Sequence, residues 1–198
     1  MTQTMTFVAP EELARANFYA LVARLFYAAP DEQLIAELVR APALEADGEL
    51  AAAWRDMVSA CRSAFPAALE NEHTELFVGT GKAEVTPYLS HYVIKYSVEN
   101  PLVELRQTLA AWGIGRRDAV PEYEDHVSGV CEAMRFAIAV QQRPADEQRD
   151  FFERFVYRGA IAFCDAVTAS KNARFYLHVA RFTRAFLEIE KAAFEMVG

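Results

Sequence analysis

The chain has 198 residues, of which 53% are hydrophobic and 24% are charged, as is typical of a globular protein. Its 20 basic and 28 acidic residues give a net charge of −8, which excludes a general nucleic-acid binder, because such a protein needs an excess of Lys and Arg to neutralise phosphates. A protein of this charge is better matched to a basic partner, and with only 8 Gly and 8 Pro its composition favours helices over a loop-rich sheet.

The N-terminal half of the chain predicts a series of short helices, because apolar residues recur every three or four positions between Pro and Gly breaks. Tyr88, Tyr92 and Tyr96 recur at every fourth position, so they would lie on one face if 88–97 is helical. The other helices are expected to begin at or just after Pro10, Asp31, Gly48, Pro66 and Pro101.

Residues 113–121 predict a loop or hinge, because Gly113 and Gly115 bracket a break and Pro121 follows. Downstream, helices are expected over 122–142, 146–168 and 171–195. No stretch alternates with period two for long enough to predict a strand. The sequence therefore predicts an all-α bundle of about eight to ten helices. We expect one domain over 1–198, with 1–112 and 122–198 as candidate lobes.

The cysteines and the lengths of the apolar segments indicate the cellular compartment of the protein. Cys61, Cys131 and Cys164 lie far apart in helical patterns, so neither a disulfide framework nor a cysteine zinc site is indicated. The N-terminus lacks a basic region followed by an apolar run, and no stretch approaches about 18 uninterrupted apolar residues. We therefore expect a cytoplasmic protein without a signal peptide or a membrane span.

The stretch Gly79-Thr80-Gly81-Lys82 resembles a phosphate loop only superficially. That motif needs glycine five residues before Gly81, where Leu76 stands, and Ser or Thr after Lys82, where Ala83 stands. The stretch also follows a helical pattern rather than a strand. We interpret it as a helix C-cap, because glycine adopts the left-handed conformation that ends many helices.

Metal and catalytic constellations are poorly represented. Glu70 and His73 form one Glu-x-x-His pair, whereas a di-iron bundle needs two such pairs and two further glutamates. No Ser/His/Asp or Cys/His set can be assembled from local spacing. We therefore expect no enzyme activity, no metal and no cofactor, although a helical ligand-binding or metal-carrying domain remains an alternative.

Asp125 and His126 form the most promising candidate site. They lie just after the predicted hinge, at the start of a helical pattern, with Glu122 and Glu124 nearby. Polar residues at a helix start are placed to meet a ligand because the first backbone N–H groups are unpaired. Carboxylates also accept strong, charge-assisted hydrogen bonds from guanidinium groups. The alternative is that Glu122 or Asp125 simply caps the helix.

The predicted tyrosine face has two interpretations. Aromatic residues at helical spacing usually pack in a core. Alternatively, Tyr88 and Tyr92 form one wall of an apolar peptide-binding groove, with their hydroxyl groups at its wet edge. The sequence leaves both interpretations open.

Two motifs resemble the TorD/DmsD/NarJ family, the cytoplasmic chaperones of molybdenum-cofactor enzymes. The first comprises Glu72, Leu76-Phe77-Val78-Gly79 and Pro87-Tyr88-Leu89-Ser90-His91-Tyr92, and the second comprises Glu122, Asp125 and His126. The chain resembles a divergent member, because Glu124 replaces the Pro that usually precedes Asp-His.

The resemblance implies a TorD-like helical, non-enzymatic chaperone of the cytoplasm. It would bind the twin-arginine signal peptide or the apo form of a molybdenum-cofactor oxidoreductase and hold it for cofactor insertion before export. Glu122 and Asp125 would engage the arginines, with His126 orienting Asp125, while Tyr88 and Tyr92 would contact the apolar part. Phe77 and Ser90 join the candidate binding residues through the first motif. Some members dimerise, which leaves a homodimer as an open alternative.

Overall fold

The computed structural model describes residues 8–79, 81–94, 100–115 and 122–197. Every named element in these ranges is helical, which confirms the predicted all-α class. Tyr96, Thr80 and residues 116–121 of the predicted hinge lie outside the described ranges. Within them, no helix is both long enough and apolar enough to cross a membrane. The division into one domain or two lobes stays a prediction.

The N-terminal half contains short helices that begin close to the predicted positions, because Pro10, Pro66 and Pro101 each occupy a first helical turn. The side chains of Asp31 and Asn100 accept hydrogen bonds from the first turns of their helices. The elements are α1 (Pro10–Tyr27), α2 (Glu32–Arg40), α3 (Glu49–Arg62), α4 (Pro66–His73), the π-helical η1 (Thr74–Val78), α5 (Ser90–Val93) and α6 (Pro101–Ala111).

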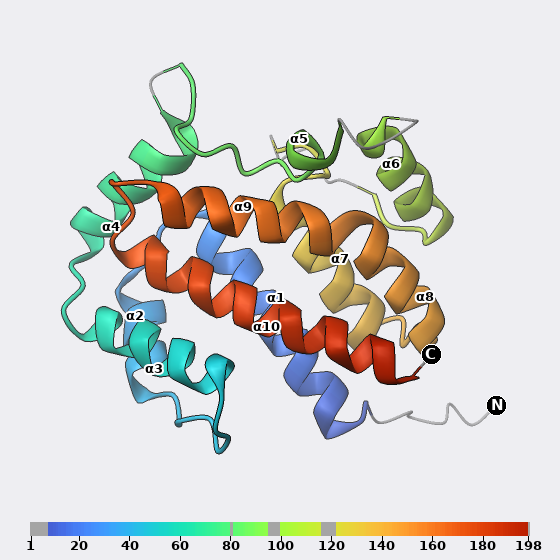
Figure 1. Ribbon diagram of the computed structural model, residues 1–198, viewed down its shortest axis with the longest axis horizontal. Helices are drawn as coiled ribbons and strands as arrows, with labels where there is room; N and C mark the ends of the chain where they lie inside the picture. Colours follow the sequence, from blue (N-terminus) through green and yellow to red (C-terminus); the bar gives the residue numbers. More distant parts are fainter. Residues whose placement is uncertain (1–7, 80, 95–99, 116–121, 198) are drawn as a thin grey trace.

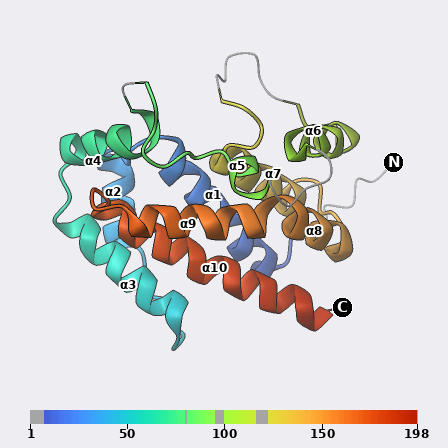
Figure 2. The ribbon, with the colours of Figure 1, turned by 45° about the horizontal axis from the view of Figure 1, so that its top comes forward.

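The C-terminal half contains α7 (Val127–Ala139), α8 (Ala145–Phe151), the π-helical η3 (Phe152–Tyr157), α9 (Arg158–Ala169) and α10 (Phe175–Val197), which is the longest helix among the described residues. α1 packs along α7, and α10 packs between α3 and α9 (Figure 1). Figure 2 shows α2, α3 and α4 at one end of the molecule and α6 and α8 at the other. Helices from both halves of the sequence therefore share one packed interior.

Aromatic side chains dominate this interior. Phe26 of α1 meets Phe163 of α9 with ring centroids 4.9 Å apart, and Phe77 of η1 meets Tyr176 of α10 at the same separation. Phe163 and Tyr176 have no exposed surface. Such edge-on aromatic contacts stabilise a core beyond the area that they bury.

One buried ion pair ties the first helix to the last. Glu190 is only 2% exposed, and Arg15 donates to both of its carboxylate oxygens at 2.7 and 2.8 Å. The Tyr19 hydroxyl donates to the same carboxylate at 3.0 Å. Removing one partner would leave a buried charge uncompensated, so this contact fixes how α1 and α10 pack.

Glu72, a residue of the first family motif, has a structural role. Its carboxylate accepts hydrogen bonds from the backbone N–H groups of Arg174, Phe175 and Tyr176 at 2.8, 3.2 and 2.9 Å. These groups lie at the start of α10, where a negative charge is favoured by the helix dipole. Glu72 therefore caps a helix that begins about a hundred residues later in the chain.

Gly79 ends η1, as the C-cap interpretation predicted. Its φ is +65°, and its N–H group donates to the Thr74 carbonyl at 2.7 Å. A Cβ atom here would lie 2.2 Å from the Lys82 carbonyl oxygen, so the tight turn excludes any side chain. The glycine therefore serves the backbone turn that ends η1.

Two predicted helix boundaries were wrong, and the helix that the tyrosine spacing requires does not include Tyr88. The helix predicted from residue 122 begins at Val127, because residues 122–126 form a turn in which His126 N–H donates to the Tyr123 carbonyl at 3.1 Å. α5 begins at Ser90 rather than at Tyr88, because Tyr88 pairs with His126, and residues 95–97 lie outside the described ranges. The last helix begins at Phe175 rather than 171, after the turn that Glu72 caps.

Candidate functional site

The two family motifs lie side by side. Leu89 N–H donates to the Asp125 carbonyl and Val127 N–H donates to the Pro87 carbonyl, both at 2.8 Å. These two hydrogen bonds form an isolated antiparallel bridge between Tyr88 and His126. The backbone therefore brings together residues that are far apart in the sequence and fixes the turn at 122–126 against the start of α5.

Tyr88 joins the two motifs through its side chain as well. Its hydroxyl group donates to Glu122 Oε2, and its ring lies edge-on to His126 at 5.5 Å between centroids. The Tyr123 ring is 6.0 Å away on another side. Burial raises the pKa of Tyr88, and the hydrogen bond to the Glu122 carboxylate raises it further. The phenol therefore stays protonated and holds the Glu122 carboxylate in place.

Asp125 faces the interior rather than the surface. It is 4% exposed, and its Oδ2 atom accepts a hydrogen bond from the Ser90 hydroxyl group. Its Oδ1 atom is buried and has no hydrogen-bond partner among the described residues. Ser90, rather than His126, is the residue whose side chain orients Asp125. This contact attaches the turn to the first residue of α5.

His126 caps α7. Its Nδ1 atom accepts from the Ser128 N–H group at 3.2 Å and lies 2.5 Å from the Ser128 hydroxyl oxygen. Because Nδ1 accepts a backbone hydrogen bond, the ring proton of the neutral form belongs on Nε2. Burial lowers the pKa of His126 to about 4, so the ring is neutral near pH 7. The capping role expected for Glu122 or Asp125 belongs to His126 instead.

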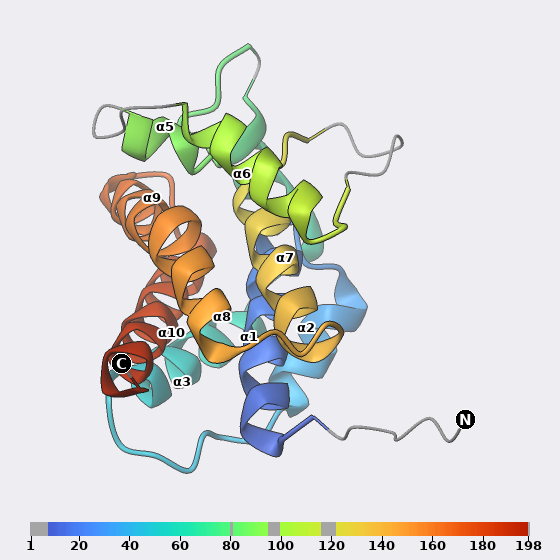
Figure 3. The same ribbon diagram turned by 90° about the vertical axis from the view of Figure 1, so that its right-hand side faces the viewer.

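A groove of about 630 Å³ opens beside this turn. Its walls are the C-terminal ends of α1 and α6, the turn itself and one side of α7 from Ser128 to Phe136, which lie next to one another in Figure 3. Its apolar lining residues include Tyr27, Leu109, Ile114, Tyr123, Ala133 and Phe136. Its charged lining residues are Arg24, Glu122, Glu124, Glu132 and Arg135.

The electrostatics of the groove favour a cation. α1 and α6 both end there, and the C-terminus of a helix carries a partial negative charge. Arg135 is paired with Glu132 at 2.8 Å, and Arg24 with Asp31 at 3.1 Å. Glu124 is paired with Arg106 at 3.0 Å, and Glu122 accepts a hydrogen bond from the neutral Tyr88 hydroxyl group. The N-terminus of α7 has the opposite partial charge and lies beside Glu122 and Glu124, which it stabilises. The groove is therefore apolar, with carboxylates at one end.

The structure separates the predicted binding residues into three groups. Glu122 and His126 line the groove, and Tyr88, Ser90 and Asp125 hold the turn in position. Phe77 and Tyr92 lie elsewhere: Phe77 is 6% exposed among core rings. The Tyr92 ring packs against the core and its hydroxyl group donates to the Thr86 carbonyl at 2.8 Å. Burial raises the pKa of Tyr92 to about 12.

Sequence reasoning missed several groove residues. Tyr123 is 55% exposed, and its place between two glutamates was a usable signal. Leu109, Ile114 and Phe136 gave no such signal, because apolar residues at helical spacing look the same whether they face a core or a groove.

Among the described residues, no group of three or more His, Cys, Asp or Glu side chains is arranged to hold a metal ion.

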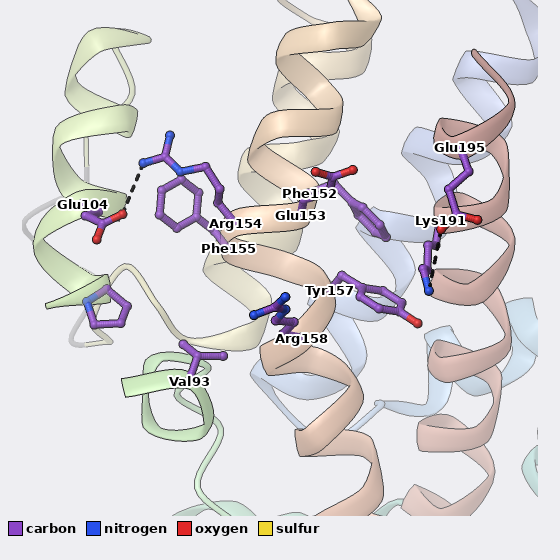
Figure 4. A pocket seen from close by; sticks show the side chains of 11 residues that line it. Val93, Glu104, Phe152, Glu153, Arg154, Phe155, Tyr157, Arg158, Lys191 and Glu195 are labelled. Atoms are coloured by element: carbon purple, nitrogen blue, oxygen red, sulfur yellow. Dashed lines mark hydrogen bonds and ion pairs between the residues drawn. The ribbon is translucent and has the colours of Figure 1, made fainter. Parts of the chain in front are cut away.

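A second cavity of about 500 Å³ lies on another side of α6, between α5, α6, η3 and α10 (Figure 4). Its lining mixes both signs of charge. Arg154 donates to Glu104 of α6 at 3.3 Å, and Lys191 lies 3.7 Å from Glu195 and over the Tyr157 ring. The two family motifs contribute nothing to this cavity.

The fold is that of redox enzyme maturation proteins. The chain is similar to the crystal structure of a protein from Archaeoglobus fulgidus described as belonging to that class, with a TM-score of 0.57 and 18% sequence identity over 94% of this chain and 99% of the other. Residues 43–165 match the nitrate reductase delta subunit family. The chain belongs to this family of NarJ/TorD-type chaperones of molybdoenzyme maturation. No curated protein matches it.

Proposed function

We propose that this chaperone binds the twin-arginine signal peptide, or the apo form, of the catalytic subunit of a molybdenum-cofactor oxidoreductase and holds it in the cytoplasm. Cofactor insertion and assembly would follow before export, and the chaperone itself would catalyse no reaction. The groove beside the paired motifs is the proposed site of the signal peptide.

One observation carries this proposal: the groove joins carboxylates to apolar walls. A twin-arginine signal combines two guanidinium groups with an apolar stretch, so it needs both surfaces at once. Glu122 and Glu124 lie at one end, while Leu109, Ile114 and Phe136 line the rest. The net charge of −8 also favours the approach of a basic segment.

The roles of the candidate residues follow from their positions. Glu122 and Glu124 face the groove, so we assign them the contacts with the arginines. Asp125 is buried against Ser90 and acts by holding the turn. His126 contributes a neutral wall, because its ring is not protonated near pH 7.

Calorimetric binding of synthetic twin-arginine signal peptides, with a Lys-Lys peptide as control, tests the proposal. Glu122→Gln keeps an acceptor for Tyr88 but removes the charge, so we expect about tenfold weaker binding, since a hydrogen bond to a charged group contributes about 1.5–3 kcal/mol. Glu153→Gln makes the same charge change at the second cavity and is expected to have little effect. Asp125→Ala is expected to abolish binding by releasing the turn.

Equal affinities for Glu122→Gln and Glu153→Gln would show that the groove is not the site. If the wild-type protein binds no signal peptide, the same measurement with the apo catalytic subunit decides whether the chaperone binds the mature part of that subunit instead. Absence of binding to both would refute the proposed function.

A further inference from the structure

An arginine of the chain itself already sits at the acidic end of the groove. Arg106 projects from α6, and its Nε atom donates to Glu124 Oε2 at 3.0 Å. Its guanidinium carbon lies 5.9 Å from the centroid of the Tyr123 ring. The Arg106 side chain is 45% exposed and that of Glu124 is 19% exposed, so the contact is open to solvent.

This arrangement is one that proteins use to recognise arginine. A guanidinium group is planar, donates to carboxylates and stacks on aromatic rings, whereas an ammonium group is a compact and strongly hydrated charge. Glu124 and Tyr123 both line the groove, and the Tyr123 ring is more than half exposed. The side chains that hold Arg106 are thus the ones that an incoming arginine would meet.

We propose that Tyr123 and Glu124 form a guanidinium subsite of the groove, and that Arg106 occupies this subsite in the free chaperone as an internal competitor. An arginine of the bound peptide displaces Arg106 and contacts the Glu124 carboxylate and the Tyr123 ring in its place. This inference rests on the proposed function, because it names the chemistry by which that groove selects arginine over lysine.

Arg106 must bind the subsite only weakly, because a peptide arginine has to displace it. An exposed ion pair contributes little in water, so Arg106 can leave Glu124 at small cost. Its removal should therefore tighten binding of an arginine peptide by only about two- to fivefold. A larger gain would require a buried pair, which this is not.

The chain offers a matched control in Arg154. Arg154 is 43% exposed and pairs with Glu104 of α6, which is 29% exposed (Figure 4). Glu104 and Arg106 are two positions apart, so they lie on opposite faces of α6, about 200° apart. Arg154→Gln therefore makes the same charge change as Arg106→Gln and also frees α6 from an ion pair, but it leaves Tyr123 and Glu124 untouched.

The first experiment measures the affinity of a twin-arginine signal peptide for the wild-type protein, Arg106→Gln and Arg154→Gln. We expect about two- to fivefold tighter binding for Arg106→Gln alone. Unchanged or weaker binding in Arg106→Gln would overturn the proposal. An equal gain in both variants would also overturn it, because the cause would then be net charge or a looser α6.

A second experiment does not depend on the peptide. N-acetylarginine amide is titrated into the wild-type protein and Arg106→Gln, and the Tyr123 ring signals are followed by NMR, with N-acetyllysine amide as control. We expect a response to the arginine probe at lower concentration in Arg106→Gln, and a much weaker response to the lysine probe. If neither a signal peptide nor the apo catalytic subunit binds but Tyr123 still responds in this way, the subsite stands and the proposed function fails. If Tyr123 responds in neither protein, the subsite is refuted.

Discussion

Replacing Glu72 by alanine should destabilise the protein through a helix that is distant in sequence. Its carboxylate accepts three backbone N–H groups at the start of α10, and alanine leaves all three without it. The Arg174 N–H group can donate a hydrogen bond to water because that residue is exposed, but Tyr176 is wholly buried. The cost therefore includes an unsatisfied buried donor as well as a lost cap.

The magnitude follows from these contacts. Loss of a helix cap costs about 1 kcal/mol, and loss of a partly buried carboxylate at a helix N-terminus costs up to about 2 kcal/mol. We expect Glu72→Ala to lower the free energy of unfolding by about 2–3 kcal/mol, which for a chain of this size lowers Tm by about 5–10 °C. Glu72→Gln keeps the acceptor without the charge and should lose about half as much.

Urea unfolding followed by circular dichroism measures this difference. Glu70→Ala is the control, because Glu70 is exposed on the same helix, carries the same charge and makes no side-chain hydrogen bond or ion pair with a described residue. A loss in Glu72→Ala within about 0.5 kcal/mol of that in Glu70→Ala would refute the capping role, since surface changes usually stay in that range.

Two further perturbations test other features. The pKa of His126 in the folded protein, about 4, lies below its ordinary value of 6.5. The stabilisation by the neutral ring is therefore complete above pH 6.5 and is lost as the pH falls toward 4, by up to about 3 kcal/mol. Urea unfolding of His126→Gln should show a correspondingly smaller loss between these pH values, and an unchanged pH dependence would contradict the burial argument. Gly79→Ala should lower the free energy of unfolding by about 2 kcal/mol or more, and Gly113→Ala by less, because both have positive φ but only Gly79 meets a backbone carbonyl. Equal thermal shifts in the two variants would exclude the steric clash.

The fold class and most helices could be predicted because their signals are local. Pro10, Pro66 and Pro101 mark helix starts through their own backbone geometry, and Gly79 marks an end in the same way. Two of the failures share a cause. The turn before α7 and the short α5 are set by the backbone pairing of Tyr88 with His126, which no local pattern reports.

The candidate site was only partly predictable for the same reason. The polar character of Glu122 and its place beside a break pointed to the groove. Asp125 has the same chemistry in sequence, yet it points inward to Ser90, because a residue's direction depends on the turn that carries it. Phe77 belongs to a motif but packs in the core, so membership of a motif does not separate residues that bind from residues that support.

The bridge between Tyr88 and His126 also bears on how this groove can diversify. Segment 89–125, which includes α6, is a closed loop held at its two ends by backbone hydrogen bonds. Doubling the length of such a loop costs only about 0.6 kcal/mol in closure entropy. The chain between the two ends of the bridge can therefore change in length in related chains without separating the two paired motifs, provided that α6 keeps Leu105 and Leu109 in the core.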